Sequence, residues 1–131
     1  MAYLFMCDNI TLVEKRIIED KFRSNLEQII TNGTNCQLWS GHVDRYGYGV
    51  WRFVFRGRRL ALPAHRVNYF IFRGFLRLHR SFHVSHRCHN KLCVKTSHLS
   101  LEPQRVNNSR RLCLLDGICH GHRGYSRCIL N

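Results

Sequence analysis

Apolar residues recur at helical spacing in the first part of the chain. Thr11 and Glu14 form a capping-box pattern, which is typical of a helix start. The apolar positions that follow, three or four residues apart, are Ile18, Phe22, Leu26 and Ile29. An Asn-Gly pair at 32–33 is a typical stop. The pattern predicts one N-terminal helix within residues 1–33, and we expect it to pack as scaffold rather than to carry function.

The stretch from 46 to 63 has a period of two instead. In "WRFVFR", 51–56, aromatic side chains alternate with basic or aliphatic ones, as in a strand with two different faces. Gly57 offers a turn, after which Leu60 and Leu62 resume the alternation. We expect an antiparallel hairpin with its apolar face buried. Its other face would carry basic residues, namely Arg52 and Arg56, with Arg58 or Arg59 near the turn.

The second half of the chain alternates short strands and helices. Pro63 suits the first position of a helix that Gly74 would stop. Strands are predicted at 81–86 and 98–102, and a helix from Pro103 to Arg111. No repeat or linker divides the chain, so we predict one α+β domain over 1–131. Its parts are an N-terminal helix (1–33), a basic hairpin and helix (36–83), a strand-strand-helix finger (84–111) and a cysteine-rich loop (113–128).

The charge of the chain indicates a polyanionic partner. Lys and Arg number 21 against 8 Asp and Glu, which gives a formal net charge of +13. An excess this large in so short a chain favours nucleic acid. The basic face of the hairpin could be an ordinary solvated surface. Alternatively, the hairpin could lie as a β-ribbon in the major groove of double-stranded DNA, which is wide enough for two strands.

Seven cysteines are too many for background use. They indicate either disulfides in a secreted protein or metal sites in an intracellular one. The start "MAYLFMCDNI" has no basic region and only a short apolar run, so it is neither a signal peptide nor a membrane span. We therefore favour metal sites, with Cys7 as the spare thiol, and an intracellular location with nucleic acid, nuclear in a eukaryote.

Six cysteines and two histidines divide into two sets of four. Cys88, Cys93 and His98 follow the pattern C-x4-C-x4-H, and Cys36, before the hairpin, is the natural fourth ligand. The second set is Cys113, Cys119, His122 and Cys128, with His120 as a rival to His122. Structural zinc takes four Cys and His ligands in a tetrahedron. The sequence therefore predicts two structural Zn²⁺ ions.

His86 lies two residues before Cys88. On a strand the two side chains would share a face, so the spacing also allows a ligand role for His86. The first set already has four ligands, however, which leaves His86 beside a loop that zinc holds rigid. A histidine fixed in a basic groove is a candidate general base.

The stretches "SHRCHNKLC" and "HLSLEPQRVNN" resemble the His-Cys box homing endonucleases, which belong to the ββα-metal (His-Me finger) nucleases. The resemblance runs from Cys36 to Cys128. It implies that His86 is the general base and that Asn107 holds a catalytic Mg²⁺ or similar ion. It also implies a catalytic arginine beside the scissile phosphate, either Arg58 or Arg59, and the two zinc sets named above. The spacing of the second set departs from that of the family.

These observations predict a divalent-metal-dependent DNA endonuclease. The alternative is a non-catalytic, zinc-stabilised DNA-binding protein, which would need neither His86 nor Asn107. Because one finger cuts one strand, a double-strand break would require a homodimer or two successive events. Only Ile129, Leu130 and Asn131 follow Cys128, so we do not expect the tail-exchanged dimer known in the family.

Overall fold

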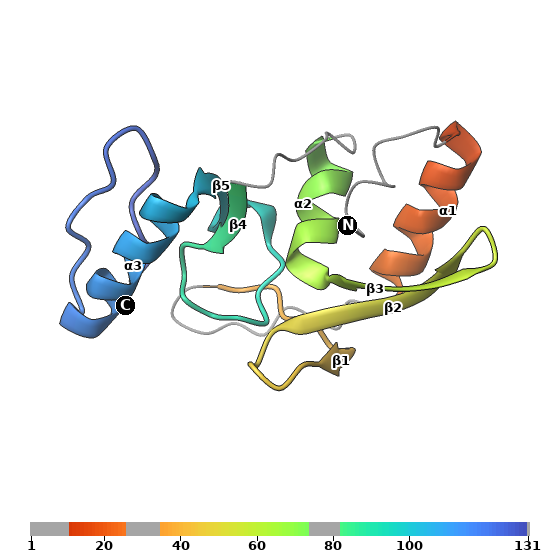
Figure 1. The fold of residues 1–131 in the computed structure, drawn as a ribbon, viewed down its shortest axis with the longest axis horizontal. Helices are drawn as coiled ribbons and strands as arrows, with labels where there is room; N and C mark the ends of the chain where they lie inside the picture. The colour runs from red at the N-terminus through yellow and green to blue at the C-terminus, as the bar shows by residue number, and fades with distance from the viewer. Residues whose placement is uncertain (1–10, 26–34, 74–81, 131) are drawn as a thin grey trace.

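The computed structural model describes residues 11–25, 35–73 and 82–130. The fold is α+β, as predicted, with two antiparallel sheets (Figure 1). Its elements, in chain order, are α1 (Leu12–Arg23), β1 (His42–Val43), β2 (Gly49–Phe55), β3 (Arg58–Pro63), α2 (Ala64–Arg73), β4 (Phe82–His86), the 3-10 turn η2 (Thr96–His98), β5 (Leu99–Pro103) and α3 (Gln104–Asp116).

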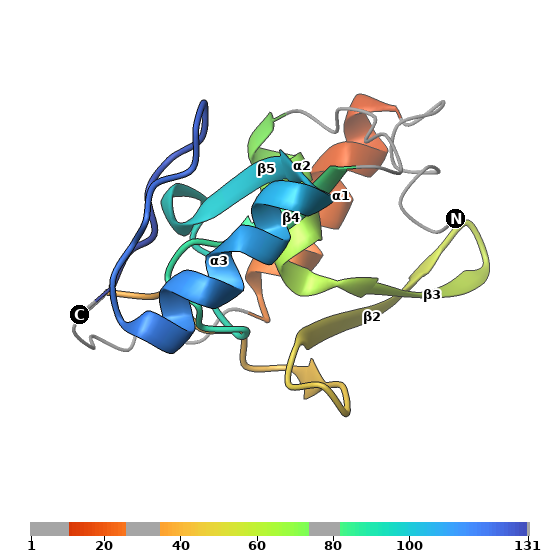
Figure 2. The same cartoon turned by 60° about the vertical axis from the view of Figure 1, so that its left-hand side comes forward.

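The two sheets divide the elements into two groups. Strands β1, β2 and β3 form one sheet, and β4 pairs with β5 in the other. Helix α2 contacts β2 and β3 and also reaches β4 and η2, so it lies between the two sheets. Helix α3 packs against β4 and β5, and the C-terminal loop runs beside it (Figure 2). In Figure 1, α1 and α3 lie at opposite ends of the long axis.

The core joins α1, α2 and the hairpin. Phe22 of α1 is fully buried, stacks on Trp39 at 5.2 Å between ring centroids, and meets Trp51 edge-on at 5.3 Å. Val67 and Phe70 of α2 close the cluster. Aromatic rings bury much apolar area, so they dominate the stability of a small core. Helix α1 thus packs against the core through Ile18 and Phe22.

The N-terminal helix is shorter than predicted within the described residues. Its capping box is present, with Thr11 and Glu14 each accepting the backbone N–H of the other. The helix ends at Arg23, where the backbone N–H of Ser24 bonds to the carbonyl of Asp20. The predicted continuation through Leu26 and Ile29 and the stop at 32–33 lie outside the described residues. The same holds for Cys7 and for Gly74, the predicted stop of α2.

The hairpin has the predicted alternation. Trp51 lies opposite Leu62, and Phe53 opposite Leu60, on the face that packs on the core. The exposed face carries Arg52 opposite Ala61 and Arg59 opposite Val54. Thus Arg52 and Arg59 share the solvent-facing side of the ribbon.

Arg56 does not lie on that face, contrary to our expectation. Arg56 and Gly57 have φ values of 50° and 77°, so they form the two-residue turn between β2 and β3. Turns of this kind need positive φ because their twist matches that of the flanking strands. Arg58, opposite Phe55, points to the aromatic side instead.

Helix α3 extends beyond its predicted end at Arg111. It continues to Asp116, and Gly117 closes it with φ of 74° and an N–H bond to the carbonyl of Cys113. The residues after Arg111 include Leu112 and Leu114, which favour a helix. The helix therefore carries Cys113, which the sequence had placed in a loop.

Within the described residues, no helix is long and apolar enough to cross a bilayer.

Candidate metal centres and active site

The first cluster of possible ligands gathers from three segments of the chain. Cys36 precedes β1, Cys88 and Cys93 lie between β4 and η2, and His98 ends η2. All four residues are buried, and their ligand atoms lie within 4.8 Å of one another. His98 Nδ1 is 3.6 Å from both Cys36 Sγ and Cys93 Sγ. A tetrahedral zinc with Zn–S bonds of about 2.3 Å places N and S ligands about 3.6 Å apart, so this set fits zinc.

Backbone pairing brings the distant Cys36 to this cluster. The Trp39 N–H donates to the Leu92 carbonyl and the Val94 N–H to the Gln37 carbonyl, both at 2.8 Å. These bonds hold the Cys36 segment antiparallel to the Cys93 segment. The sequence suggested Cys36 because the first set needed a fourth ligand. In the structure, two backbone hydrogen bonds place Cys36 beside Cys93.

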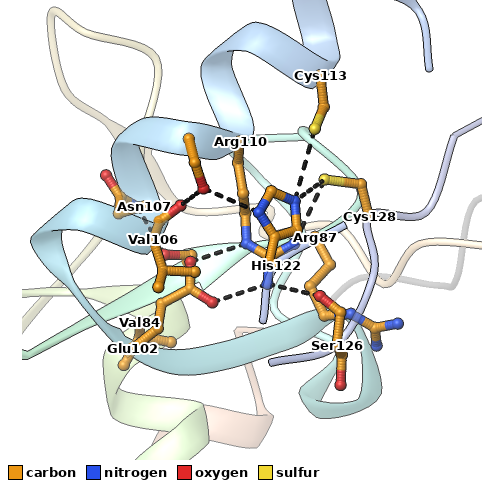
Figure 3. Close-up of polar contacts among 12 residues, drawn as sticks. Val84, Arg87, Glu102, Val106, Asn107, Arg110, Cys113, His122, Ser126 and Cys128 are labelled. Atoms are coloured by element: carbon orange, nitrogen blue, oxygen red, sulfur yellow. Dashed lines mark hydrogen bonds and ion pairs between the residues drawn. The ribbon is translucent and has the colours of Figure 1, made fainter. Parts of the chain in front are cut away.

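The second cluster lies at the end of α3. Cys113 is on the helix, while Cys119, His122 and Cys128 come from the loop that returns beside it. Figure 3 shows three of these residues, namely Cys113, His122 and Cys128. His122 Nε2 is 3.5 Å from Cys113 Sγ and 3.4 Å from Cys128 Sγ. These separations also fit tetrahedral zinc. The two Cys3His clusters therefore fit two zinc sites.

Hydrogen bonds select His122 rather than its rival. Ser109 donates its hydroxyl proton to the Val106 carbonyl, so its oxygen accepts from His122 Nδ1 at 2.8 Å. Nε2 is then the unprotonated nitrogen and faces the sulfurs, as a metal-bound histidine requires. His120 is exposed, and its Nε2 lies 2.6 Å from Asp116 Oδ2.

Backbone N–H groups surround the sulfurs of the second cluster. Burial alone would raise the pKa of the Cys119 thiol, but N–H donors from Cys128 and Gly121 lower it to about 7. Those two N–H groups lie 3.2 and 3.4 Å from the sulfur. Because metal binds the thiolate, donors that stabilise the thiolate also favour the metal-bound state.

A cleft of about 420 Å³ lies next to the first cluster. It opens between β4, the starts of β2 and α2, the loop after β4, and α3. Both His86 and Asn107 line it, although one comes from β4 and the other from α3. The two residues for which the resemblance implies catalytic roles thus meet in one space.

His86 presents one unprotonated nitrogen. Its Nε2 is 2.9 Å from the carbonyl oxygen of Cys93. Since a carbonyl can only accept, Nε2 carries the proton and Nδ1 does not. Burial, the largest effect, lowers the pKa of His86 to about 4, with smaller effects from His89 and Lys91, while the bond to Cys93 acts in the opposite direction. His86 is therefore neutral at pH 7.

Two rings hold His86 in place. The His65 ring centroid lies 4.3 Å away and that of Tyr48 5.9 Å away. His65 Nε2 in turn lies 3.0 Å from the Val84 carbonyl, which fixes its own orientation. These contacts hold the imidazole ring of His86 in one orientation, so its Nδ1 has a fixed direction.

Asn107 is held by its nitrogen. Its Nδ2 lies 2.6 Å from the hydroxyl oxygen of Ser85, a buried residue on β4. The amide oxygen, Oδ1, is then left for another partner. An amide oxygen is a hard, uncharged ligand of the kind that Mg²⁺ accepts.

The cleft is basic, and the sequence did not single out its cations. Its lining residues include Arg66, Lys91 and Arg111, while neither Arg58 nor Arg59 is among the described residues that line it. Both lie near the turn of the hairpin, at the opposite end from Val50 and Pro63. One of these cations could have been identified from the sequence, because Arg111 follows Asn107 by four residues. This spacing places both side chains on one side of a helix.

The hairpin turn is tied to α1. Arg56 Nε and Nη2 lie 2.8 and 2.7 Å from the two carboxylate oxygens of Glu14. The bonds from Arg56, with smaller help from Thr11, lower the pKa of Glu14 to about 2. Arg52 Nη2, by contrast, lies 3.0 Å from His42 Nε2 on the exposed side of the sheet.

Comparison with known families matches residues 24–128 to the zinc-binding loop region of homing endonucleases. No characterised protein and no solved structure matched the chain. The family match spans most of the chain and includes all eight residues of the two Cys3His clusters, as well as His86 and Asn107. It confirms the resemblance found in the motifs: the chain belongs to the family defined by the zinc-binding loop region of homing endonucleases.

Proposed function

We propose that this protein is a DNA endonuclease that hydrolyses phosphodiester bonds with the help of a divalent ion. The observation that carries the proposal is the meeting of His86 and Asn107 in one basic cleft. Each is bonded at one end, His86 to Cys93 and Asn107 to Ser85, so that an unprotonated nitrogen and an amide oxygen remain for a substrate. A protein that only binds DNA needs neither arrangement.

His86 would act as the general base. A water molecule beside Nδ1 would lose its proton to that nitrogen while its oxygen attacks phosphorus. The base must be unprotonated before the step, and burial keeps His86 neutral at pH 7. Negative charge on a bound phosphate would then favour the imidazolium that forms.

Asn107 would hold the divalent ion through Oδ1. Bound there, Mg²⁺ would supply positive charge at the scissile phosphate and the leaving oxygen. Asp44 also lines the cleft, but its Oδ1 already accepts the backbone N–H groups of Tyr46 and Tyr48. With one neutral ligand in a basic cleft, we expect phosphate oxygens and waters to complete the coordination shell only when DNA is bound.

The cations of the cleft would contact the phosphates. Arg111, four residues after Asn107 on α3, and Arg66 on α2 line it from two sides. Lys91 is directed by a bond to the Tyr46 carbonyl and lies 5.1 Å from the centre of the Tyr48 ring. Arg59 shares the exposed ribbon face with Arg52, and there both would contact DNA outside the cleft. Arg58 remains a candidate for DNA contact near the hairpin turn.

The two zinc ions would be structural. Each cluster offers four ligands and leaves no open position for a substrate, which is the character of a structural site. Zinc at the first cluster would fix the loop that carries the Cys93 carbonyl, and thereby the orientation of His86.

Cleavage of plasmid DNA tests the proposal. Purified protein with Mg²⁺ should convert supercoiled plasmid to nicked or linear product, and linear product would require either a homodimer or two successive cuts. His86→Ala should lower the rate by about 10²–10⁴-fold while zinc content and DNA affinity stay unchanged. His120→Ala, a histidine outside the cleft, is the matched control and should cut normally. Equal cleavage rates for His86→Ala and wild type would overturn the role of His86 as general base, and DNA binding by wild type without any cleavage would favour a DNA-binding protein without catalysis.

A further inference from the structure

The turn between β1 and β2 presents a tyrosine to solvent beside the cleft. The side chain of Tyr46 is 61% exposed. Asp44 and Tyr48, two residues to either side of it in the chain, both line the cleft. The Tyr46 carbonyl also accepts a hydrogen bond of 3.0 Å from Nζ of Lys91, which lines the cleft as well. Tyr46 therefore lies at the rim of the space in which the proposed chemistry takes place.

This turn is held by its backbone and by one carboxylate. Oδ1 of Asp44 accepts the backbone N–H groups of Tyr46 and Tyr48, at 2.8 and 3.0 Å. The Asp44 N–H donates to the Tyr48 carbonyl, and the N–H of Gly47, a residue with φ of 90°, donates to the Asp44 carbonyl. None of these bonds uses the phenol ring of Tyr46. The turn thus displays the ring without depending on it for its own structure.

Arg45 holds the tyrosine ring from one side. Its Nη2 donates to the Tyr46 hydroxyl at 2.7 Å, and its guanidinium carbon lies 4.8 Å from the ring centroid. A guanidinium over a ring is attracted to the π-electrons and so favours one ring orientation. Both side chains are exposed, which leaves ring surface accessible to a ligand. The pair therefore offers a flat aromatic surface with a positive charge beside it.

The chemistry of this pair fits one part of a nucleic acid. Aromatic rings bind the faces of bases by stacking, and arginine binds phosphate. In regular duplex DNA each base face is covered by its neighbours, so a side chain meets base edges in the grooves and the sugar-phosphate backbone. A base that has left the stack exposes its faces. The ring of Tyr46 therefore matches an unstacked base, and the charge of Arg45 matches a phosphate next to that base.

We propose that Tyr46 and Arg45 form a platform on which an unstacked DNA base rests while a neighbouring phosphate lies in the cleft. This inference rests on the proposed function, because the cleft would supply the phosphate contacts. The bond from Lys91 to the Tyr46 carbonyl ties the platform to the cleft, so the spacing between base and phosphate is fixed. The preferred substrate is then DNA with an unpaired nucleotide beside the cleavage site, rather than uniform duplex.

Binding without Mg²⁺ measures the platform separately from cleavage. Fluorescence anisotropy should show that wild type binds a duplex with one unpaired nucleotide about tenfold more tightly than the same duplex fully paired, which is the scale of one base–aromatic stack. Tyr46→Leu keeps an apolar side chain but loses the flat ring, so it should abolish that preference. Tyr46→Phe is the matched control. It keeps the ring and loses only the hydroxyl bond to Arg45, so its preference should stay within about twofold of wild type.

The fold of the variants should be unchanged, since the bonds that hold the turn do not use the ring. Elemental analysis should find two zinc ions in each variant, and the melting temperatures should agree with that of wild type.

A cross-link identifies the side chain that stacks on the base. DNA with 5-iododeoxyuridine at the unpaired position, irradiated in the complex, should attach to an aromatic side chain that lies against it. Mass spectrometry of the digested wild-type complex should place the adduct on Tyr46, and Tyr46→Leu should lose it. An adduct on another aromatic residue would overturn the platform.

The outcomes separate the platform from the proposed function. If wild type prefers unpaired DNA but cuts none with Mg²⁺ or Mn²⁺, the proposed function fails, and the platform stands as a DNA-binding site. If wild type cuts DNA but binds paired and unpaired DNA equally, the platform is overturned. Equal losses of affinity for both DNAs in Tyr46→Leu would also overturn it, because the ring would then contact duplex. So would a loss in Tyr46→Phe as large as in Tyr46→Leu, since the hydroxyl rather than the ring would then make the contact.

Discussion

His86 and Asn107 each carry two polar ends, and in each the protein uses one end to define the other. The Cys93 carbonyl accepts the proton of His86 Nε2, and Ser85 accepts that of Asn107 Nδ2. In the proposed mechanism, His86 then offers an unprotonated nitrogen as the base, and Asn107 offers a neutral amide oxygen as the ion ligand. At the scale of the residue, hydrogen-bond direction thus carries as much chemical information as residue identity.

The arginine that contacts the scissile phosphate is expected to come from the cleft. Arg111→Ala should lower the cleavage rate by about 10–100-fold, because a charge-assisted contact in a partly desolvated site is lost. Arg59→Ala removes the same charge from the hairpin, outside the cleft, and should lower affinity more than rate. Single-turnover cleavage at saturating protein distinguishes the two. A larger rate loss for Arg59→Ala would return the role to the hairpin arginines.

The sequence allowed prediction of those site residues that lie close together in the chain. His86, Cys88, Cys93 and His98 fall within thirteen residues, so their spacing carries the pattern. The hydrogen bonds that orient the side chains of the cleft come from backbone carbonyls, as for His86, and from elements that meet only in three dimensions, as for Ser85 and Asn107. A backbone carbonyl has no residue type, and a cross-strand register has no local signature. For that reason His65, Lys91 and Arg66 were not singled out.

At the scale of elements, zinc at the two Cys3His clusters would replace packing in the segments that lack apolar residues. The loop from 117 to 130 contains several glycines and histidines, and its described contacts are largely to sulfur, backbone and Arg110. Zinc binding contributes folding free energy directly in such segments. The first cluster also closes a long loop, since Cys36 and His98 are 62 residues apart.

Loss of one zinc ligand should therefore remove structure together with metal. Cys93→Ser should reduce the zinc content from two ions to one per chain and abolish a cooperative thermal transition. Zinc binding in small metal-dependent domains amounts to about 10–16 kcal/mol at pH 7, more than a domain of this size can spare. Elemental analysis and circular dichroism measure both effects. Cys7→Ser, the predicted spare thiol, should keep both ions, and loss of an ion there would reassign the ligands.

The Glu14–Arg56 pair joins two elements that the sequence had described separately. Glu14 also closes the capping box of α1, so one carboxylate serves the helix and the hairpin turn. Its pKa is depressed to about 2 from the usual value near 4.5. A depressed pKa means that the stabilisation is present above pH 4.5 and is lost as the pH falls toward 2. At pH 7 it is fully present.

Glu14→Gln should consequently lower the melting temperature at pH 7 by a few degrees. Glu19→Gln is the matched control, because among the described residues Glu19 pairs only within α1, with Lys15 at 4.0 Å. It should have a smaller effect, as exposed helical pairs do. Calorimetry at low and high salt checks both, and the excess loss in Glu14→Gln should shrink in high salt because Arg56 is exposed. Equal effects in the two variants would show that the hairpin turn gains nothing from α1.

The predicted elements were largely confirmed where side-chain periodicity decides the structure. The alternation in 51–62 defined the hairpin faces because one face is buried, and the capping box defined the start of α1. Ends were less predictable. Helix α3 continues past Arg111 because no residue before Gly117 favours a helix end. Arg56 lies in the turn with a positive φ because the pairing register of β2 and β3 places it there, although its residue type does not favour that conformation.

At the scale of the whole molecule, the arrangement of charge decides how DNA would be held. The chain carries a net charge of +13, and its cations lie both in the cleft and on the exposed face of the hairpin, where Arg52 and Arg59 stand on neighbouring strands. An anionic rod that contacts both regions must span β2–β3 and the space between β4 and α3. The ribbon would then provide affinity and register, while the cleft provides chemistry.

Salt dependence measures this division of labour. Each neutralised phosphate releases condensed counterions, so the logarithm of affinity should fall linearly with the logarithm of salt concentration, at a slope of about −0.9 per contact. Arg52→Ala should reduce the slope by about one unit on any DNA if it contacts a phosphate. If Arg52 reads a base instead, its loss should cost about 1–3 kcal/mol at one position of a preferred site and leave other sequences unaffected.

Arg56→Ala is the control: Glu14 already neutralises this arginine in the turn, so its loss should leave the slope nearly unchanged. Fluorescence anisotropy across a salt series supplies the slopes, and an equal reduction in both variants would mean that the hairpin turn meets the DNA as well as the exposed strand face.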